Sequence, residues 1–568
     1  MKEGDRMYLE KMKSAEFWDT VRTDESYRFL IDDLLSLYAR YGQGELPDIS
    51  YDAFMHYHRT GSRHLFETDY YFPRRQRMTT CALLSLIYPD NEEYFSNLCN
   101  TIWAILNEYS WSLPNHDPRS ALEYSDDYID LFAAETGYAI SEIRLLFRDR
   151  FDPVLNARIT HALDRRIIRS FIDHAYGWET VRTNWAAVCA GSVAVAFMRE
   201  RPDLYPLIRP RIDAAMEAFL SGFRDDGVCQ EGFAYWSYGF GFFLCYAHSL
   251  LEFTGGKRDL FKNEKVKKIA QFPNCVYLSG NSVISFSDGG RTGLLFLGAA
   301  NLLRHHYGDI LPHLPKEFYC TSGINSCWCQ HAMSFAYFDP ALFADSQPKD
   351  EEYLFAETGW YVRKNALFGF AAKAGNNDEP HNHNDIGSFI FAAGGEQVLA
   401  DLGCGEYNRD YFSSRRYTIL CNRSLGHSVP LLDGFEQCAG AEYAGLMRCE
   451  GESVLIDMTG AYPVSRVQSC LRRFDLKPDG FDLTDAFSYA EPCPVMERFV
   501  SLMEPEISGN RVLLGDAELC AGPGWSCKVS REQHSVHASS DTFINVYMID
   551  FYPEHQGEES FLLSVRVK

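Results

Sequence analysis

The residues best suited to chemistry crowd into one short stretch, 376–389, which reads Asn-Asn-Asp-Glu-Pro-His-Asn-His-Asn-Asp-Ile-Gly-Ser-Phe. In a β-strand, positions i and i+2 face the same way, so an extended His381-x-His383 is predicted to point both imidazoles into one site. Two imidazoles and a carboxylate, with room for water, are typical of a catalytic zinc site. The alternative is structural, with each histidine hydrogen-bonded in a polar loop.

The sequence around these histidines predicts that β-strands hold them in place. Residues 388–393 have strand composition and end at Gly394-Gly395, and residues 397–403 follow as a return strand. This pattern predicts a hairpin that brings Asp401 back towards the histidines. A third polar stretch, 422–429, supplies His427.

The first 335 residues have a helical texture, with apolar residues at three- and four-residue spacing. Examples are 30–38, 100–107 and 142–147, and residues 153–175 are predicted to form one long helix. Repeated antiparallel helix pairs over such a length indicate a solenoid or a closed toroid.

Beyond about residue 350 the pattern changes to short alternating segments separated by turns, which predicts an antiparallel β-sandwich. The predicted strands include 360–363, 367–372, 453–458, 495–502 and 543–549. We therefore expect a multidomain α+β chain. Its parts are an α/α helical toroid over residues 1–340, a linker over 340–352, and a β-sandwich over 350–568 that carries the His/Asp cluster.

Two helical stretches have the composition of a sugar-binding groove. In one, Asn184 and Trp185 open a helix of small residues, and in the other, Glu231, Trp236 and Tyr238 follow a glycine-containing turn. Aromatic faces beside amides and acids suit a sugar. The alternative is that Trp236 and Tyr238 fill the core.

Composition excludes several classes of function. The 568 residues carry a formal charge of -24, which argues against a nucleic-acid partner. No uninterrupted apolar run long enough for a membrane span and no signal-peptide core are visible. The 17 cysteines show no CxxC pairs, and together these features predict a cytoplasmic protein with mostly reduced thiols and no membrane partner.

Five motifs in this order resemble the heparinase II/III-type polysaccharide lyases and the related alginate and oligo-alginate lyases. They are Asn184-Trp185, the stretch from Glu231 to Gly239, His-Asn-His-Asn-Asp-x-Gly-Ser-Phe from 381, Ala-Asp-x-Gly from 400, and Asn-x-x-x-Gly-His ending at 427. The resemblance covers most of the chain and implies a helical toroid followed by a β-sandwich. It does not specify the substrate.

The resemblance also implies site residues. His381 is implied to be the catalytic histidine, Tyr235 the catalytic tyrosine and Asn184 the amide that neutralises the uronate carboxylate. Tyr238, one helical turn on, is the alternative tyrosine. The implied ligands of a structural zinc ion near the active site are His383, Asp401 and His427. Location alone adds Trp185, Glu231, Trp236, Tyr238 and Arg416 as substrate-binding candidates.

The implied reaction is β-elimination on a uronic-acid-containing glycan, which is an acidic poly- or oligosaccharide of the glycosaminoglycan or alginate type. Such a lyase needs a base for the C5 proton, an acid for the leaving C4 oxygen and a group that neutralises the carboxylate. Tyr235 suits the acid, and His381 the base or the neutralising partner. The alternatives are a glycoside hydrolase that uses acids such as Asp225, a zinc hydrolase, and a non-catalytic glycan-binding protein.

Overall fold

The computed structural model describes residues 7–116, 127–321, 327–343, 350–536 and 543–568. The chain divides into two compact units. The helical unit comprises Met1–Gly222, Trp236–Ala270 and Leu294–Asp345, and the sandwich unit comprises Phe223–Tyr235, Gln271–Gly293 and Ser346–Lys568. The sandwich unit thus includes two segments from the helical part of the sequence. Residues 344–349 of the predicted linker lie outside the described residues.

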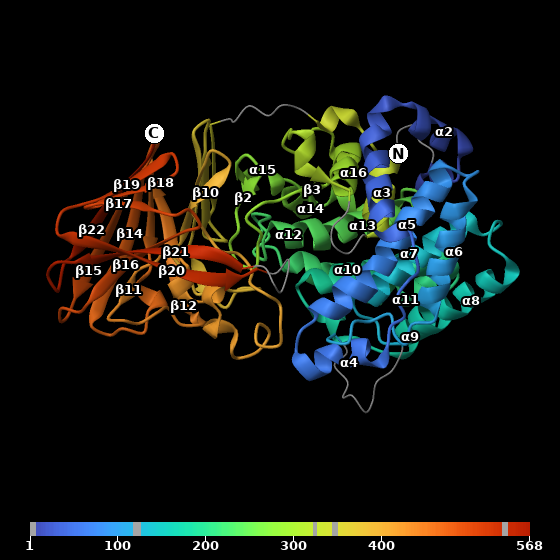
Figure 1. Cartoon of the computed structure of the whole chain (residues 1–568), viewed down its shortest axis with the longest axis horizontal. Coiled ribbons are helices and arrows are strands. Elements are labelled where there is room, and N and C mark those ends of the chain that lie inside the picture. The colour runs from blue at the N-terminus through green and yellow to red at the C-terminus, as the bar shows by residue number, and fades with distance from the viewer. Residues whose placement is uncertain (1–6, 117–126, 322–326, 344–349, 537–542) are drawn as a thin grey trace. The chain divides into compact units, whose positions relative to one another are not determined.

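Helices dominate the first 340 residues, as the apolar spacing predicts (Figure 1). Their bounds are α1 Tyr8–Met12, α2 Ala15–Thr23, α3 Arg28–Leu37, α4 Tyr51–Thr60, α5 Phe72–Ile87, α6 Glu92–Leu106, α7 Leu131–Phe147, α8 Pro153–Leu163, α9 Ser170–Asp173, α10 Asn184–Glu200, α11 Tyr205–Ser221, α12 Phe233–Tyr235, α13 Gly241–Phe253, α14 Glu264–Ala270, α15 Pro273–Val276, α16 Leu297–Tyr307 and α17 Trp328–Ala336.

Local sequence explains where several of these helices begin. The side chain of Asp152 accepts hydrogen bonds from the backbone N–H groups of Val154 and Leu155, which caps α8 beside a proline at its first turn. The predicted helix over 153–175 is α8 and α9, joined by a wider π-helical turn at Asp164–Arg169. Helix α10 is buried almost all round and packs against α7, α11 and α13, so it forms the centre of the helical unit.

Strands dominate the rest of the chain. Their bounds are β1 Tyr277–Ser279, β2 Ser282–Val283, β3 Leu295–Phe296, β4 Tyr319–Cys320, β5 Glu351–Phe355, β6 Trp360–Lys364, β7 Phe368–Lys373, β8 Gly375–Asn377, β9 Phe389–Ala393, β10 Glu396–Leu399, β11 Leu431–Leu432, β12 Gly440–Glu450, β13 Ser453–Asp457, β14 Val467–Lys477, β15 Gly480–Tyr489, β16 Val495–Ser501, β17 Glu506–Ser508, β18 Arg511–Leu514, β19 Ala517–Ala521, β20 Trp525–Ser535, β21 Phe543–Pro553 and β22 Ser560–Val567.

Beside the small sheet formed by β1 and β2, three larger sheets build the sandwich unit. Their strand orders are β10-β9-β7-β6-β5, β11-β16-β21-β20 and β17-β18-β19-β22-β15-β14-β13-β12-β8, with antiparallel neighbours throughout. One apolar core joins residues from all three sheets, including Phe370, Phe474 and Phe499. The predicted toroid-plus-sandwich architecture is therefore confirmed.

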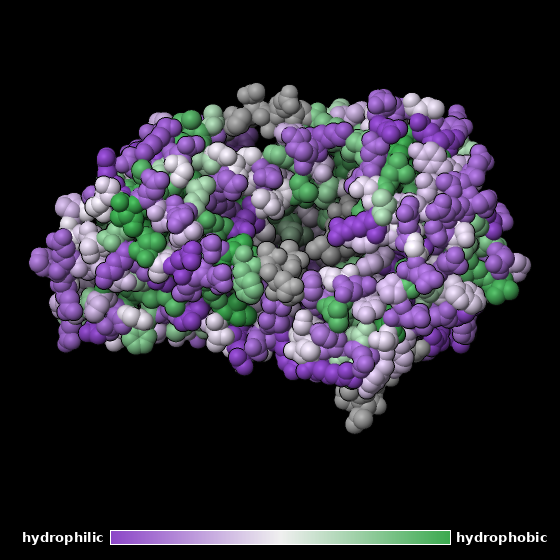
Figure 2. All heavy atoms as spheres, viewed as in Figure 1, coloured by the Kyte–Doolittle hydropathy of each residue, from purple (hydrophilic) through white to green (hydrophobic). Residues whose placement is uncertain are grey.

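The visible surface in Figure 2 is largely hydrophilic, with hydrophobic side chains scattered among polar ones. A net charge of -24 on 568 residues agrees with this view. Across the described residues, no helix combines the length and apolar character needed to span a membrane.

Candidate active site

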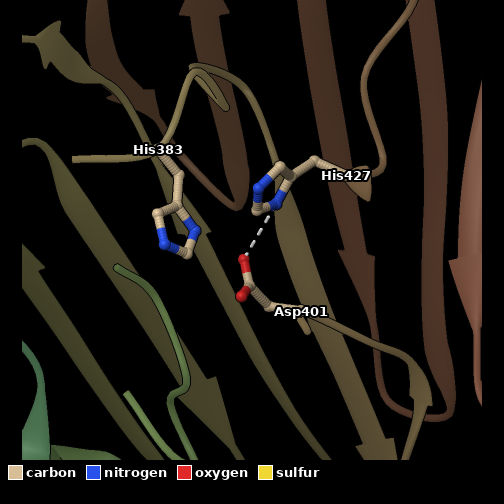
Figure 3. A group of neighbouring side chains, drawn as sticks. All are labelled: His383, Asp401 and His427. Carbon is tan, nitrogen blue, oxygen red and sulfur yellow. Dashed lines mark hydrogen bonds and ion pairs between the residues drawn. The ribbon is translucent and has the colours of Figure 1, made fainter. Parts of the chain in front are cut away.

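Three predicted ligands, His383, Asp401 and His427, converge in the sandwich unit (Figure 3). Each offers one ligand atom, these atoms lie within 4.8 Å of one another, and all three side chains are fully buried. His383 comes from the loop between β8 and β9, Asp401 lies two residues beyond the end of β10, and His427 follows a short helical turn at Ser424–Gly426. The predicted β9–β10 hairpin is confirmed, and it delivers Asp401 to the histidines.

The donor set fits a metal ion. His383 Nε2 lies 3.0 Å from Oδ1 of Asp288, while its buried Nδ1 has no hydrogen-bond partner among the described residues and faces the other two ligands in Figure 3. His427 Nε2 lies 2.8 Å from the carbonyl oxygen of Cys421, and its Nδ1 lies 3.1 Å from Asp401 Oδ2. Each imidazole is thus held through one nitrogen and presents the other to the cluster, as metal-binding histidines do.

The predicted strand through His381 and His383 is wrong. Both residues lie in the loop between β8 and β9, and His381 has φ of 56°, a left-handed conformation that is uncommon outside glycine. An extended His-x-His would present both rings on one face. Instead the loop turns at His381, and the two imidazoles meet because both contact Asp288.

Asp288 is the centre of this region. The residue follows β2, has an exposed fraction of 2%, and accepts hydrogen bonds through both carboxylate oxygens. Its donors come from two stretches of the chain, 381–383 and 407–416. They are His381 Nδ1 at 2.5 Å, His383 Nε2 at 3.0 Å, Tyr407 OH at 3.1 Å, Tyr411 OH at 2.5 Å and Arg416 Nη2 at 3.0 Å.

The predicted acid and base meet beside Asp288. The rings of Tyr235 and His381 lie 4.4 Å apart between centroids, and the hydroxyl of Tyr235 is 2.6 Å from that of Tyr407. His381 Nε2 lies 3.4 Å from Oε2 of Glu231, a buried residue. The structure therefore brings Tyr235, Glu231, His381 and Arg416 into one cluster within the sandwich unit.

Charge sets the protonation of this cluster. Burial would raise the pKa of Asp288, but His381, His383 and Arg416 hold it well below its usual range. Burial and the nearby Asp288 raise the pKa of Tyr235 well above 10, so the phenol keeps its proton. Burial opposes protonation of His381, but Asp288 and Glu231 raise the pKa of this imidazole.

The remaining predicted residues belong to the helical unit. Asn184 is the buried first residue of α10, and a Cβ at Gly239 would lie 2.8 Å from its Cβ, so glycine permits this close approach. The Trp185 ring packs edge-on against His116 at 4.9 Å. The indole N–H of Trp236 donates to the carbonyl of Ile269 at 2.8 Å.

Trp236 is fully buried. This side chain fills the core, which corrects the prediction that it contacts substrate. Tyr238, the alternative catalytic tyrosine, instead donates its hydroxyl to the carboxylate of Glu135 within the helical unit.

Sequence reasoning missed Asp288, Tyr407 and Tyr411. Asp288 stands in the stretch Ser-Asp-Gly-Gly at 287–290, and an acid between a strand and a glycine pair is a usable signal for a functional turn. The two tyrosines follow the Ala-Asp-x-Gly motif by a few residues. Nothing in their local pattern separates them from core aromatics.

Comparisons with known proteins agree with this architecture. Residues 348–536 match the family described as Heparinase II/III-like, C-terminal. The solved structure of heparinase III is 14% identical with a TM-score of 0.60, over 99% of this chain and 92% of that one. A mutant of heparan sulfate lyase HepC from Pedobacter heparinus is 13% identical with a TM-score of 0.60, over 99% and 87%.

A more distant solved structure has the same fold. Chondroitin AC lyase from Streptomyces coelicolor A3, solved with chondroitin sulphate, is 10% identical with a TM-score of 0.56, over 98% of this chain and 82% of that one. Among curated proteins, none matches this sequence.

Proposed function

We propose that the chain, which matches the family described as Heparinase II/III-like, C-terminal over residues 348–536 and shares the fold of heparinase III, is a polysaccharide lyase that cleaves uronic-acid-containing glycans by β-elimination. The substrate is an acidic poly- or oligosaccharide, as it is for the glycosaminoglycan lyases that share the fold. The observation that carries the proposal is the Tyr235–His381 pair, whose rings lie 4.4 Å apart beside a buried carboxylate. An acid and a base side by side are what an elimination requires.

Tyr235 acts as the general acid. Burial and Asp288 raise the pKa of Tyr235, so the phenol is protonated when substrate arrives. It gives this proton to the C4 oxygen that leaves as the glycosidic bond breaks. The hydroxyl of Tyr407 lies 2.6 Å from that of Tyr235 and donates its own proton to Asp288 Oδ2, so Tyr407 accepts from the phenol of Tyr235 and holds it in position.

In its neutral form, His381 acts as the base that takes the C5 proton, and Asp288 and Glu231, which raise the pKa of this imidazole, stabilise the protonated ring that results. Asp288 accepts a hydrogen bond from its Nδ1 and so fixes the ring, which leaves Nε2 as the atom for proton exchange. The electron pair from the C5–H bond forms the C4=C5 double bond and expels the C4 oxygen. The resemblance implies that Asn184 is the residue that neutralises the uronate carboxylate, which stabilises enolate-like charge.

His383, Asp401 and His427 would hold the metal ion, and we propose zinc, because two imidazoles and a carboxylate are ligands that zinc prefers. Burial lowers the pKa of His383 and so favours the neutral ring that a ligand must be. When bound, the ion would supply a fixed positive charge that ties together the three loops of the cluster. No step of the elimination needs it as a reactant, so its effect on turnover is structural.

Ultraviolet absorbance tests the proposal, because elimination creates a conjugated C4=C5 double bond that hydrolysis does not. The panel contains heparan sulfate, chondroitin sulfate, hyaluronan and alginate, each as polymer and as short oligosaccharides. Absorbance that grows with one substrate, and not with the Tyr235→Phe variant, supports the lyase. New reducing ends with flat absorbance would mean a hydrolase, and no change on any glycan would favour a binding protein.

A further inference from the structure

The buried carboxylate of Asp288 divides its two oxygens between two groups of residues. Oδ2 accepts from His381 Nδ1 and from Tyr407, whose hydroxyl in turn contacts Tyr235. This oxygen therefore faces the proposed base and acid. A buried carboxylate is costly unless its oxygens are satisfied, and here each bond goes to a residue of the site.

The other oxygen faces the metal cluster. Oδ1 of Asp288 accepts from His383 Nε2 at 3.0 Å, from Tyr411 at 2.5 Å and from Arg416 at 3.0 Å. Because His383 donates from Nε2, its Nδ1 is left deprotonated and turned towards Asp401 and His427. One carboxylate thus sets the tautomer of a metal ligand and the orientation of the base.

The backbone holds Asp288 rigidly. Ser287 has φ of 60°, and the neighbouring Gly289 is packed from two sides by glycines. A Cβ at Gly232 would come within 3.0 Å of Gly289 Cα, and one at Gly403 within 2.0 Å of Gly289 O. Gly232 precedes Tyr235, the proposed acid, and Gly403 follows Asp401, a proposed metal ligand. The two segments that carry these residues therefore pack closely against the turn that contains Asp288.

We infer that Asp288 is the positioning residue that couples the metal cluster to the acid–base pair, through Oδ1 on His383 and Oδ2 on His381 and Tyr407. It acts by fixing two imidazoles and, through Tyr407, the proposed catalytic phenol, and this role needs no contact of its own with substrate or metal. The kinetic half of this inference depends on the proposed lyase function. The metal-binding half does not, so the two can fail separately.

The first experiment compares Asp288→Asn with the unmodified chain after loading with zinc. An amide can accept from some of the five donors but not all, so zinc retention against a chelator should weaken by about 10- to 100-fold. On a glycan that the unmodified chain cleaves, kcat should fall about 100-fold while KM stays within about threefold, since the proposed role of Asp288 needs no contact with substrate.

Glu142→Gln is the matched control. This buried carboxylate of the helical unit also accepts from several donors, namely Tyr8, Arg199 and Trp328, none of which belongs to the proposed site. The control should lower the melting temperature without changing zinc retention or the ratio of kcat to KM. Asp288→Asn that behaves like the control overturns the inference, as does an unmodified chain that binds no zinc.

Two milder variants keep the test decisive if Asp288→Asn does not fold. Tyr411→Phe removes a donor from Oδ1 and should weaken zinc retention about tenfold with a smaller change in kcat. Tyr407→Phe removes a donor from Oδ2 and should lower kcat with zinc retention unchanged. Equal effects of both variants on both readouts would overturn the division between the two oxygens.

Discussion

Tyr235 and Tyr238 stand three residues apart in one motif, yet each belongs to a different network. Tyr235 reaches Asp288 through Tyr407 in the sandwich unit, and Tyr238 donates directly to Glu135 in the helical unit. Positive and neutral donors surround Asp288 and keep its carboxylate ionised, whereas burial raises the pKa of Glu135 to about 8. The carboxylate of Asp288 is therefore ionised and that of Glu135 is protonated at pH 7, and the donors around each carboxylate decide which form it takes.

The largest expected effect separates the two tyrosines. Tyr235→Phe removes the proton for the leaving oxygen and should lower kcat by about 10²- to 10⁴-fold. Tyr238→Phe removes only a hydrogen bond to Glu135 and should stay within about tenfold of the unmodified chain. Absorbance of the unsaturated product measures both, with substrate affinity as the control for folding. An active Tyr235→Phe would transfer the acid role to another residue.

The second-largest effect is expected from loss of a metal ligand, which tests the network around Asp288. His383→Ala removes one ligand and leaves Asp401 and His427 as an incomplete set. Metal content should fall close to zero, and the melting temperature should fall by several degrees because the loops lose their cross-link. Elemental analysis and calorimetry measure the two together. Unchanged metal content in this variant would contradict the assigned ligands.

The network around Glu135 leads us to expect that the free energy of unfolding depends on pH. The pKa of Glu135 is about 8 in the folded chain against 4.5 for an ordinary glutamate, so between these values the folded chain retains a proton that the unfolded chain releases. Stability from this group is therefore lost as pH rises, by at most about 1.4 kcal/mol per pH unit.

Glu135→Gln keeps the shape of the side chain and cannot ionise. Its melting temperature relative to the unmodified chain should therefore rise steadily from about pH 5 to about pH 8. Calorimetry across this range provides the check. A constant difference between the two proteins would mean that Glu135 is ionised in the folded state.

The smallest effect is expected from substituting a glycine that packs against the turn that contains Asp288. Gly403 has φ of 64° and an added Cβ would lie 2.0 Å from Gly289 O, whereas Gly394 has φ of 60° with open space around it. Gly403→Ala should cost about 2–3 kcal/mol and lower kcat, and Gly394→Ala about 1 kcal/mol with kcat unchanged. Denaturant midpoints measure the stability of the two variants. An equal loss of free energy of unfolding in both would contradict close packing of Gly403 against the turn that contains Asp288.

The sequence determined the features that depend on near neighbours. Apolar spacing located the helices, and alternation with glycine turns located the strands and the hairpin that carries Asp401. The family resemblance carried by the motifs also implied the His383, Asp401 and His427 group, which the fold brings together. These predictions succeed because helix and strand periodicity is local, and because several spaced motifs together are specific where one is not.

Tertiary structure alone decided the rest. His381 contacts Asp288 across 93 positions, and Tyr235 contacts Tyr407 across 172, distances over which no local pattern persists. The same limit explains why the sequence could not separate Tyr235 from Tyr238, or show that Trp236 is core. Burial and hydrogen-bond donors set the charge and orientation of a side chain, and only the folded chain brings those donors together.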